Sequence, residues 1–392
     1  MPTENALGPR IAYHRRIARM TQQELADAAS IHVGTLRKIE RGARGASDAV
    51  LESIAAALGV DPSHLLASRD RAEARVHAAM PALSAAIAAY DVPDAGPVRP
   101  LPELRADVEE AVTWRLASQY VRIARQMPPL IGELTRAFQL ASGGARAETA
   151  SLLVSALRTA DAVAYKYGAR DLSARLVDLM RWAAPYAQDQ LLDAAVAYVR
   201  TETFFAARAH ASGLRALEMA ADSAPAARDD ETRAVRGALH MRAAVIAGRA
   251  GRADAADHHL AEARRMGDAV SESIYQGTAF GPDSVRIHEV AVAVSLGGDH
   301  AHRAIEVARE WKPPEDLPTE RRSGFYIELA RAQLWSGLPR DAFESLKVAR
   351  HIAPQHTRDH PWVREDAATL RRLRRADAES LSNFAEWCHA GE

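Results

Sequence analysis

Between Leu7 and Ala67 the hydrophobic positions follow helical spacing, and turn-forming residues interrupt them at short intervals. Thr21 with Glu24 three residues later has the sequence of a capping box, which opens a helix. Gly42 stands where a glycine ends a helix. The pattern therefore predicts five short helices: residues 7–18, 22–29 and 33–41, a fourth opened by Ser47 and Asp48, and a fifth opened by Asp61 and Pro62.

In the rest of the chain one hydrophobic signature recurs: a small residue, an aliphatic residue four positions later, and alanine three positions after that. These offsets place the three residues on one helix face, and the small residue lets a second helix approach closely. Four copies are Gly213/Leu217/Ala220, Ala256/Leu260/Ala263, Ala301/Ile305/Ala308 and Ala342/Leu346/Ala349, and a degraded copy is Ser173/Val177/Met180. Turn signals precede the copies, so each unit is predicted to be a helical hairpin: Gly168, His210–Ser212, Gly251, Gly297–Gly298 and Gly337.

The segment that joins these two patterns is rich in alanine and then in proline. Residues 69–89 are expected to be helical, whereas the prolines of residues 91–102 cannot continue a helix. Residues 104–141 are predicted to form a divergent hairpin and residues 361–387 one or two capping helices. We therefore predict three parts: an N-terminal domain (1–69), a connecting helix and linker (70–103), and a repeat domain (104–392).

The composition supports an all-α fold. Alanine, the best helix former, makes up about a fifth of the chain. Cys388 is the single cysteine, which excludes intramolecular disulfides and cysteine-based zinc modules. The longest uncharged run, Ala78–Tyr90, is too short to span a bilayer, and the first ten residues contain no apolar segment. We therefore expect a cytoplasmic protein without membrane contact.

The charge is distributed unevenly. The formal net charge is −1, which gives the whole chain no attraction for nucleic acid. Residues 1–46, however, carry eight basic and four acidic side chains, a local net charge of +4. A local basic excess is the footprint that a DNA-binding domain requires.

The sequence TQQELADAASIHVGTLRKIERG, followed later by ALGVDP, resembles the phage-repressor/Cro-type helix-turn-helix family, often called Xre. This resemblance covers about 60 residues and implies that the helix after the turn enters the major groove. It implies base contacts from the first residues of that helix, with Arg37 as first choice for a guanine and Val33 for a thymine methyl. Phosphate contact alone is the other interpretation of Arg37 and Lys38. The implied DNA-binding residues are Gln22, Gln23, His32, Val33, Gly34, Thr35, Arg37, Lys38 and Arg44.

The repeated hairpins resemble tetratricopeptide repeats, most closely in the copy with Tyr326, Leu329 and Ala330 ahead of Gly337. An Xre-type domain followed by such a superhelix resembles bacterial transcription regulators, including peptide-pheromone receptors and an actinobacterial regulator group. Pheromone receptors commonly hold a peptide backbone with asparagines, whereas this sequence has only Asn5 and Asn383. A small molecule or a protein partner is therefore favoured over a peptide, which remains an alternative.

Candidate ligand residues are aromatic and basic side chains of the first helices of the hairpins. Tyr198, Phe204, Arg208 and Arg242 are the selected set, although such residues also serve as core. Asp254, His258 and Glu262, next to His259, have metal-ligand chemistry but are expected to form the solvated outer face of a helix. No cofactor or metal is predicted, and the phosphate-binding and nucleophile motifs of common enzymes are missing, so we expect no enzyme.

The sequence thus predicts a DNA-binding transcription regulator whose repeat domain dimerises and senses a small-molecule or peptide signal. Two-fold symmetry would match a palindromic operator of double-stranded DNA. The alternative is a protein-interaction adaptor, in which the repeats hold a partner protein and the N-terminal domain is vestigial or a docking module.

Overall fold

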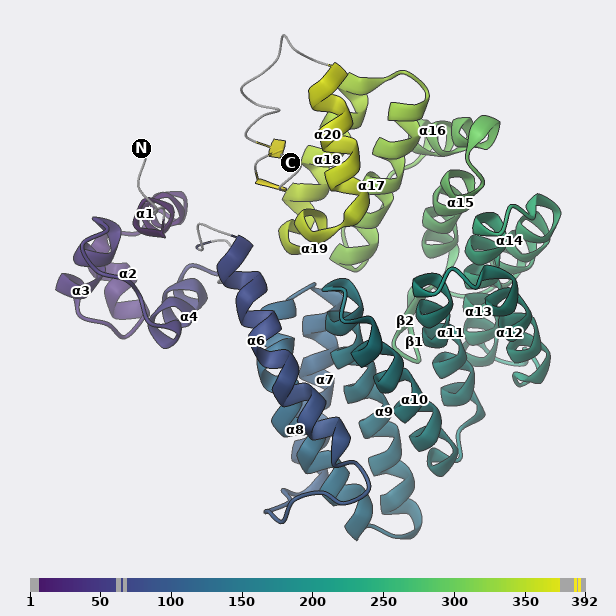
Figure 1. Cartoon of the computed structure of the whole chain (residues 1–392), viewed down its shortest axis with the longest axis horizontal. Coiled ribbons are helices and arrows are strands. Elements are labelled where there is room, and N and C mark those ends of the chain that lie inside the picture. The colour runs from purple at the N-terminus through teal and green to yellow at the C-terminus, as the bar shows by residue number, and fades with distance from the viewer. Residues whose placement is uncertain (1–6, 61–64, 66–68, 374–383, 386, 389–392) are drawn as a thin grey trace. The chain divides into compact units, whose positions relative to one another are not determined.

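The computed structural model describes residues 7–60, 65, 69–373, 384–385 and 387–388. The chain forms two compact units, Met1–Pro81 and Ala82–Glu392. The described residues are almost entirely helical (Figure 1), as the sequence predicts, apart from one short β-hairpin. Among the described helices, none combines the length and the hydropathy needed to cross a membrane.

The first unit begins with four short helices that start and end where the sequence signals stand. Thr21 and Glu24 form the predicted capping box, and Ser47 caps the fourth helix. Gly42 has a φ of +73°, the left-handed conformation that glycine adopts most easily. The fifth predicted helix, opened by Asp61 and Pro62, lies outside the described residues. The four helices are α1 (Leu7–Ile17), α2 (Gln22–Ala28), α3 (Val33–Glu40) and α4 (Asp48–Ala57).

Helix α6 (Arg69–Ala88) contains the division between the two units. The proline-rich segment after it is not helical, and it is fixed to α8 (Tyr120–Leu140). The side chain of Gln139 donates to the carbonyl of Tyr90 (3.2 Å), and Glu133 accepts from the Arg99 backbone N–H (2.8 Å). In the described structure this segment therefore follows the surface of the second unit.

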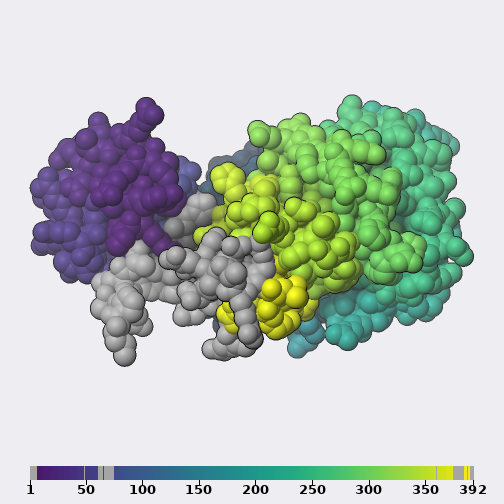
Figure 2. Space-filling view, turned by 90° about the horizontal axis from the view of Figure 1, so that it is seen from above, coloured from purple at the N-terminus to yellow at the C-terminus, as the bar shows by residue number. Residues whose placement is uncertain are grey.

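The second unit is a series of antiparallel helical hairpins, in which consecutive helices pack against each other (Figure 1). In the space-filling view its yellow C-terminal segments lie directly against the green ones (Figure 2). The hairpins are α7 (Leu101–Leu116) with α8, α9 (Gly143–Lys166) with α10 (Arg170–Ala187), α11 (Gln190–Ala206) with α12 (His210–Ser223), α13 (Asp230–Arg249) with α14 (Ala253–Gly267), α15 (Pro282–Leu296) with α16 (Ala301–Glu310), and α17 (Thr319–Trp335) with α18 (Pro339–Ile352). A 3-10 turn, η1 (Gly298–His300), precedes α16, and α19 (Pro354–Asp359) and α20 (Pro361–Leu373) follow α18.

The repeated signature marks the buried face of the second helix in the hairpins from α9–α10 to α17–α18. All three residues of the copies in α14, α16 and α18 are buried, and Gly213 of α12 approaches Phe204 so closely that a Cβ would lie 2.9 Å from it. The turns fall at Gly168, Gly251, Gly297–Gly298 and Gly337, as predicted. The turn predicted at His210–Ser212 is wrong. It lies at residues 207–209, because Arg208 takes the left-handed conformation (φ +55°) that glycine provides elsewhere.

A two-stranded antiparallel hairpin between α14 and α15 was not predicted. Strands β1 (Ser273–Tyr275) and β2 (Thr278–Phe280) are joined by Gln276 and Gly277, both with positive φ. Such a two-residue connection matches the twist of the strands. Phe280 is fully buried, and its ring lies where a side chain at Gly237 of α13 would stand.

The polar cluster on α14 is only partly solvated. Asp254 and His258 are exposed, as predicted, but His259 is buried. Its Nδ1 lies 3.0 Å from Nδ1 of His240, and its Nε2 lies 3.6 Å from Glu218. The described residues contain no group of side chains arranged to hold a metal ion.

Candidate functional site

The first candidate site is the exposed part of α3 and of the turn before it. Helix α3 begins at a histidine cap, in which Nδ1 of His32 accepts from the Gly34 N–H (3.0 Å). A Cβ at Gly34 would lie 3.0 Å from that nitrogen, so the glycine leaves room for the cap. Leu36 and Ile39 are buried and hold the opposite face of α3 against the rest of the unit.

The predicted DNA-contacting residues differ in exposure. Arg37 and Lys38 are exposed, and among the described residues neither has an ion-pair partner. Val33, Gly34 and Thr35 are half-buried. The remaining exposed members of the set are Gln23, His32 and Arg44, of which Gln23 donates to Asp27 (2.8 Å).

Gln22 takes part in a half-buried polar contact that the sequence did not reveal. Its amide donates to Oε2 of Glu40 (2.6 Å), and Arg15 of α1 donates to both oxygens of the same carboxylate (2.7 and 3.1 Å). Burial by itself would raise the pKa of Glu40, but these hydrogen bonds outweigh it and lower the pKa below the ordinary value. The contact joins α1, α2 and α3 and fixes the orientation of α3.

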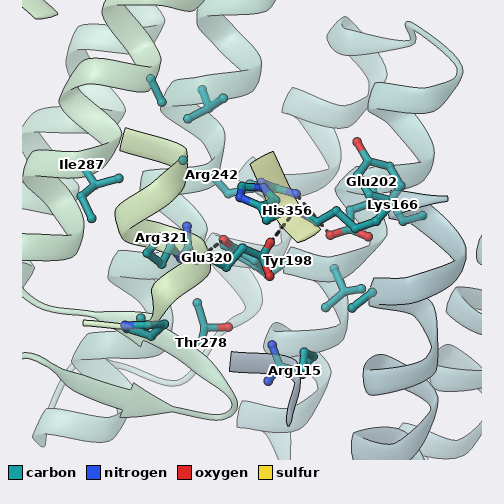
Figure 3. A pocket seen from close by; sticks show the side chains of 18 of the residues that line it. Arg115, Lys166, Tyr198, Glu202, Arg242, Thr278, Ile287, Glu320, Arg321 and His356 are labelled. Atoms are coloured by element: carbon teal, nitrogen blue, oxygen red, sulfur yellow. Dashed lines mark hydrogen bonds and ion pairs between the residues drawn. The ribbon is translucent and has the colours of Figure 1, made fainter. Parts of the chain in front are cut away.

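The second candidate site is a cavity of about 290 Å³ within the second unit. The first helices of the hairpins, α7, α9, α11, α13, α15 and α17, line it together with β2 and α19. Figure 3 shows it from close by. Six basic side chains and four carboxyl groups line it, an excess of two positive charges when all are ionised. The basic residues are Arg115, Arg158, Lys166, Arg242, Arg249 and Arg321, and the acidic residues are Asp161, Glu202, Glu320 and Glu328.

Two of these arginines donate hydrogen bonds to neutral groups of the β-hairpin. Arg115 donates to the Gly277 carbonyl (2.9 Å), and Arg158 donates to the Gln276 carbonyl and the Thr278 hydroxyl (both 2.6 Å). Both therefore hold the turn of the β-hairpin. Burial, followed by the charges of Arg115 and Arg321, lowers the pKa of Arg158 to about 9.

Tyr198 lies among the basic groups of the cavity. Its hydroxyl accepts from Nη2 of Arg321 (2.9 Å), whose Nη1 lies 3.0 Å from Nε2 of His288. The guanidinium of Arg242 lies 5.0 Å from the centre of the Tyr198 ring. Burial alone would raise the pKa of Tyr198, but Arg321 and Arg242 outweigh it and lower the pKa.

The carboxyl groups are in different states. Glu320 pairs with Lys166 (2.6 Å) and, although burial opposes ionisation, Lys166 and His356 hold its pKa at about 2. Burial and the neighbouring Glu202 raise the pKa of Asp161 well above its ordinary value. Burial also raises the pKa of Glu328 to about 8. Glu328 is therefore mainly neutral near pH 7, and burial disfavours the ionised form of Asp161.

The four ligand residues selected from the sequence do not meet at one place. Tyr198 and Arg242 line the cavity. Phe204 packs beside Gly213 with Arg200 above its ring (5.2 Å), and Arg208 is exposed in the α11–α12 turn. Neither Phe204 nor Arg208 is among the residues that line the cavity.

Sequence reasoning missed Arg115, Arg158 and Arg321, which lie on α7, α9 and α17. One local signal marks Arg158. In α9, Arg158 and Asp161 follow Val154 and Leu157 within a stretch of mostly apolar, buried residues. A charged pair on such a face identifies a polar site, but the partner residues on other helices are not visible in the sequence.

The N-terminal geometry agrees with a family comparison. Residues 11–65 match the model of the helix-turn-helix family, so the chain carries a helix-turn-helix domain at its N-terminus. This is the class of module that places its second motif helix in the DNA major groove. No curated protein matches the chain.

Comparison with solved structures gives weak similarity. Bacillus thuringiensis PlcR, solved with the peptide PapR7 and DNA, shares 14% identity over 68% of this chain and 95% of its own, with a TM-score of 0.30. S. thermophilus ComR, solved with DNA and its signalling peptide ComS, shares 15% over 67% of this chain and 100% of its own, with a TM-score of 0.22. At such TM-scores the function has to be argued from the residues of this chain.

Proposed function

We propose that this protein is a sequence-specific DNA-binding transcription regulator in which residues 1–69 read DNA and residues 104–392 dimerise and receive a small-molecule or peptide signal. The observation that carries the proposal is the exposed face of α3, where Arg37 and Lys38 have no acidic partner among the described residues. We assign Arg37 to reading a guanine, and Gln22, Gln23 and Arg44 to holding phosphates.

The repeat unit supplies what a single helix-turn-helix domain lacks. One such domain buries a small interface, so two copies on a palindromic operator, about one helical turn apart, provide the affinity. We assign the tetratricopeptide-like hairpins to dimerisation and to signal reception in the cavity, and residues 70–103 to the connection between the two functions.

The test is DNA binding by the full chain, measured by fluorescence anisotropy at about 150 mM salt on sequences obtained by unbiased selection. Replacing Arg37 and Lys38 together by alanine is expected to weaken binding to the selected sequence about 100-fold. The matched control, Arg233→Ala with Lys347→Ala, removes the same charges from the surface of the second unit and is expected to change affinity less than about twofold.

If no sequence is selected over random DNA, the proposed function as a sequence-specific regulator is contradicted. Loss of regulation in cells with the Arg37/Lys38 variant supports it, whereas an unchanged phenotype favours the adaptor. The dimer is tested separately, by light scattering of the full chain with and without the selected operator.

A further inference from the structure

The cavity of the second unit contains more positive charge than its own side chains neutralise. The bonds of Arg115, Arg158 and Arg321 go to two carbonyls, two hydroxyls and an imidazole. Within the described part of the chain, none of the three forms an ion pair. A buried charge without a counter-ion is costly, so an unpaired group of this kind indicates a site that a ligand completes.

These bonds leave donors free. A guanidinium group has more N–H donors than the one or two that each arginine uses here, and Nε of Arg115 is buried without any partner. The terminal nitrogens of Arg115 and Arg158 both lie within 3.2 Å of the position that a Cβ of Gly277 would take. These are the nitrogens that bond the turn carbonyls, so the two guanidinium groups lie together beside the β-hairpin turn, where both line the cavity.

Within the described part of the chain, the acidic side chains of the cavity form no ion pair with these three arginines, although the charges of Glu320 and Glu202 act on them. Glu320 forms an ion pair with Lys166, and one carboxylate oxygen of Glu202 lies 3.7 Å from the guanidinium of Arg242. Glu328, whose pKa burial raises to about 8, is mainly neutral near pH 7, and burial also raises the pKa of Asp161. In Figure 3 Arg115 and Thr278 lie toward one side of the cavity and Glu202 and Lys166 toward the other. The arginine side therefore keeps its excess of positive charge near pH 7.

The size of the cavity limits the ligand. Its volume of about 290 Å³ lies at the lower end of the range for small-molecule sites, about 300–1,000 Å³. A metabolite fits into this volume, whereas a long peptide does not. Thr278 and Tyr198 add hydroxyl groups beside the arginines, which suits a polar ligand.

We propose that this cavity is the effector site for a small organic dianion, such as a phosphate monoester or a short dicarboxylate, held by Arg115, Arg158 and Arg321. This inference rests on the proposed function for its regulatory role, but the binding itself can be measured without DNA.

The experiment is isothermal titration calorimetry of the full chain at pH 8, where succinate and inorganic phosphate are both mainly dianions, with acetate as the monovalent control. The ionic strength is held constant with NaCl. We expect saturable binding of at least one dianion and about tenfold weaker binding of acetate, because the second negative charge meets a second unpaired guanidinium. Equal affinity for acetate, or no saturable binding of either dianion, would overturn the proposal.

Variants separate the arginine site from a general ionic effect. Arg321→Gln is expected to weaken dianion binding about tenfold. Glu202→Gln removes a negative charge from the cavity and is expected to tighten binding about threefold, an effect that a loss of folding cannot imitate. Arg233 lies outside the cavity, so Arg233→Gln is the control with unchanged affinity. Unchanged binding in Arg321→Gln or weaker binding in Glu202→Gln would contradict the assignment.

The DNA experiment distinguishes the two proposals. If the dianion binds and no DNA sequence is selected, the effector site is supported and the proposed DNA-binding function is contradicted. If a DNA sequence is selected and no dianion binds, the proposed DNA-binding function is supported and the effector site is contradicted.

Discussion

At the residue scale, single contacts decide which conformation the N-terminal unit adopts. The capping residues Thr21 and Ser47 stand where the sequence predicts them, because a cap is a local feature of a few neighbouring residues. Gly8 and Glu40, by contrast, act on residues far along the chain. Their roles depend on the packing of α1 against α3, which the sequence does not show.

The first prediction concerns Gly8. A Cβ at this position would lie 2.3 Å from the carbonyl oxygen of Ile39 and 2.4 Å from that of Glu40, and a backbone cannot move away as a flexible side chain does. Gly8→Ala is therefore expected to lower the free energy of unfolding by about 1–3 kcal/mol, measured by urea denaturation of the full chain. Gly45→Ala, which meets nothing within 4 Å, is the control. Equal midpoints for the two variants would refute the close approach.

The second prediction concerns pH. Because the pKa of Glu40 is lowered in the folded protein, its contribution to stability is complete above the ordinary value of 4.5 and is lost as the pH falls through the lower folded value. Glu40→Gln is expected to cost about 1–3 kcal/mol of unfolding free energy at pH 7, and less at about pH 3. Urea denaturation at both pH values measures this. Glu306→Gln, in an exposed ion pair, is expected to cost almost nothing, and a pH-independent cost for Glu40→Gln would contradict the argument.

At the scale of elements, the repeated signature predicted the hairpins but not all of their turns. A glycine with positive φ closes the α9–α10, α13–α14 and α17–α18 hairpins at Gly168, Gly251 and Gly337. The α11–α12 turn uses Arg208 instead, so no glycine marks this turn in the sequence. The β-hairpin was missed for a similar reason, since strands of three residues are too short for a hydrophobic alternation.

The third prediction concerns the α11–α12 turn. A non-glycine residue in the left-handed conformation costs about 1–2 kcal/mol, so Arg208→Gly is expected to raise the unfolding free energy by about 1 kcal/mol. Gly251→Ala is expected to lower it by a similar amount. Thermal denaturation compares the two. Because Arg208 does not line the cavity, dianion affinity is expected to remain unchanged, and its loss would show that Arg208 contacts the ligand.

At the scale of the whole molecule, the two proposed functions reside in separate compact units. If an effector in the second unit changes DNA affinity by some factor, DNA must change effector affinity by the same factor. This relation holds for any route by which the units communicate.

The fourth prediction is that reciprocity. The change in operator affinity caused by saturating succinate, from anisotropy, is expected to equal the change in succinate affinity caused by saturating operator, from calorimetry. Arg321→Gln is expected to weaken the succinate response in both measurements, whereas Arg233→Gln leaves it intact. Unequal factors would show that succinate also acts outside the cavity, for instance at the basic N-terminal unit.

The sequence by itself determined the helices, the helix-turn-helix domain and the repeated hairpins, because caps, glycine turns and helical periodicity depend on residues close together in the chain. It also located the basic excess that an average charge of −1 conceals. Only the tertiary structure decided which side chains form the cavity. Arg115, Arg158 and Arg321 come from helices far apart in the chain, and the cost of burying their charges exists only once those helices are packed.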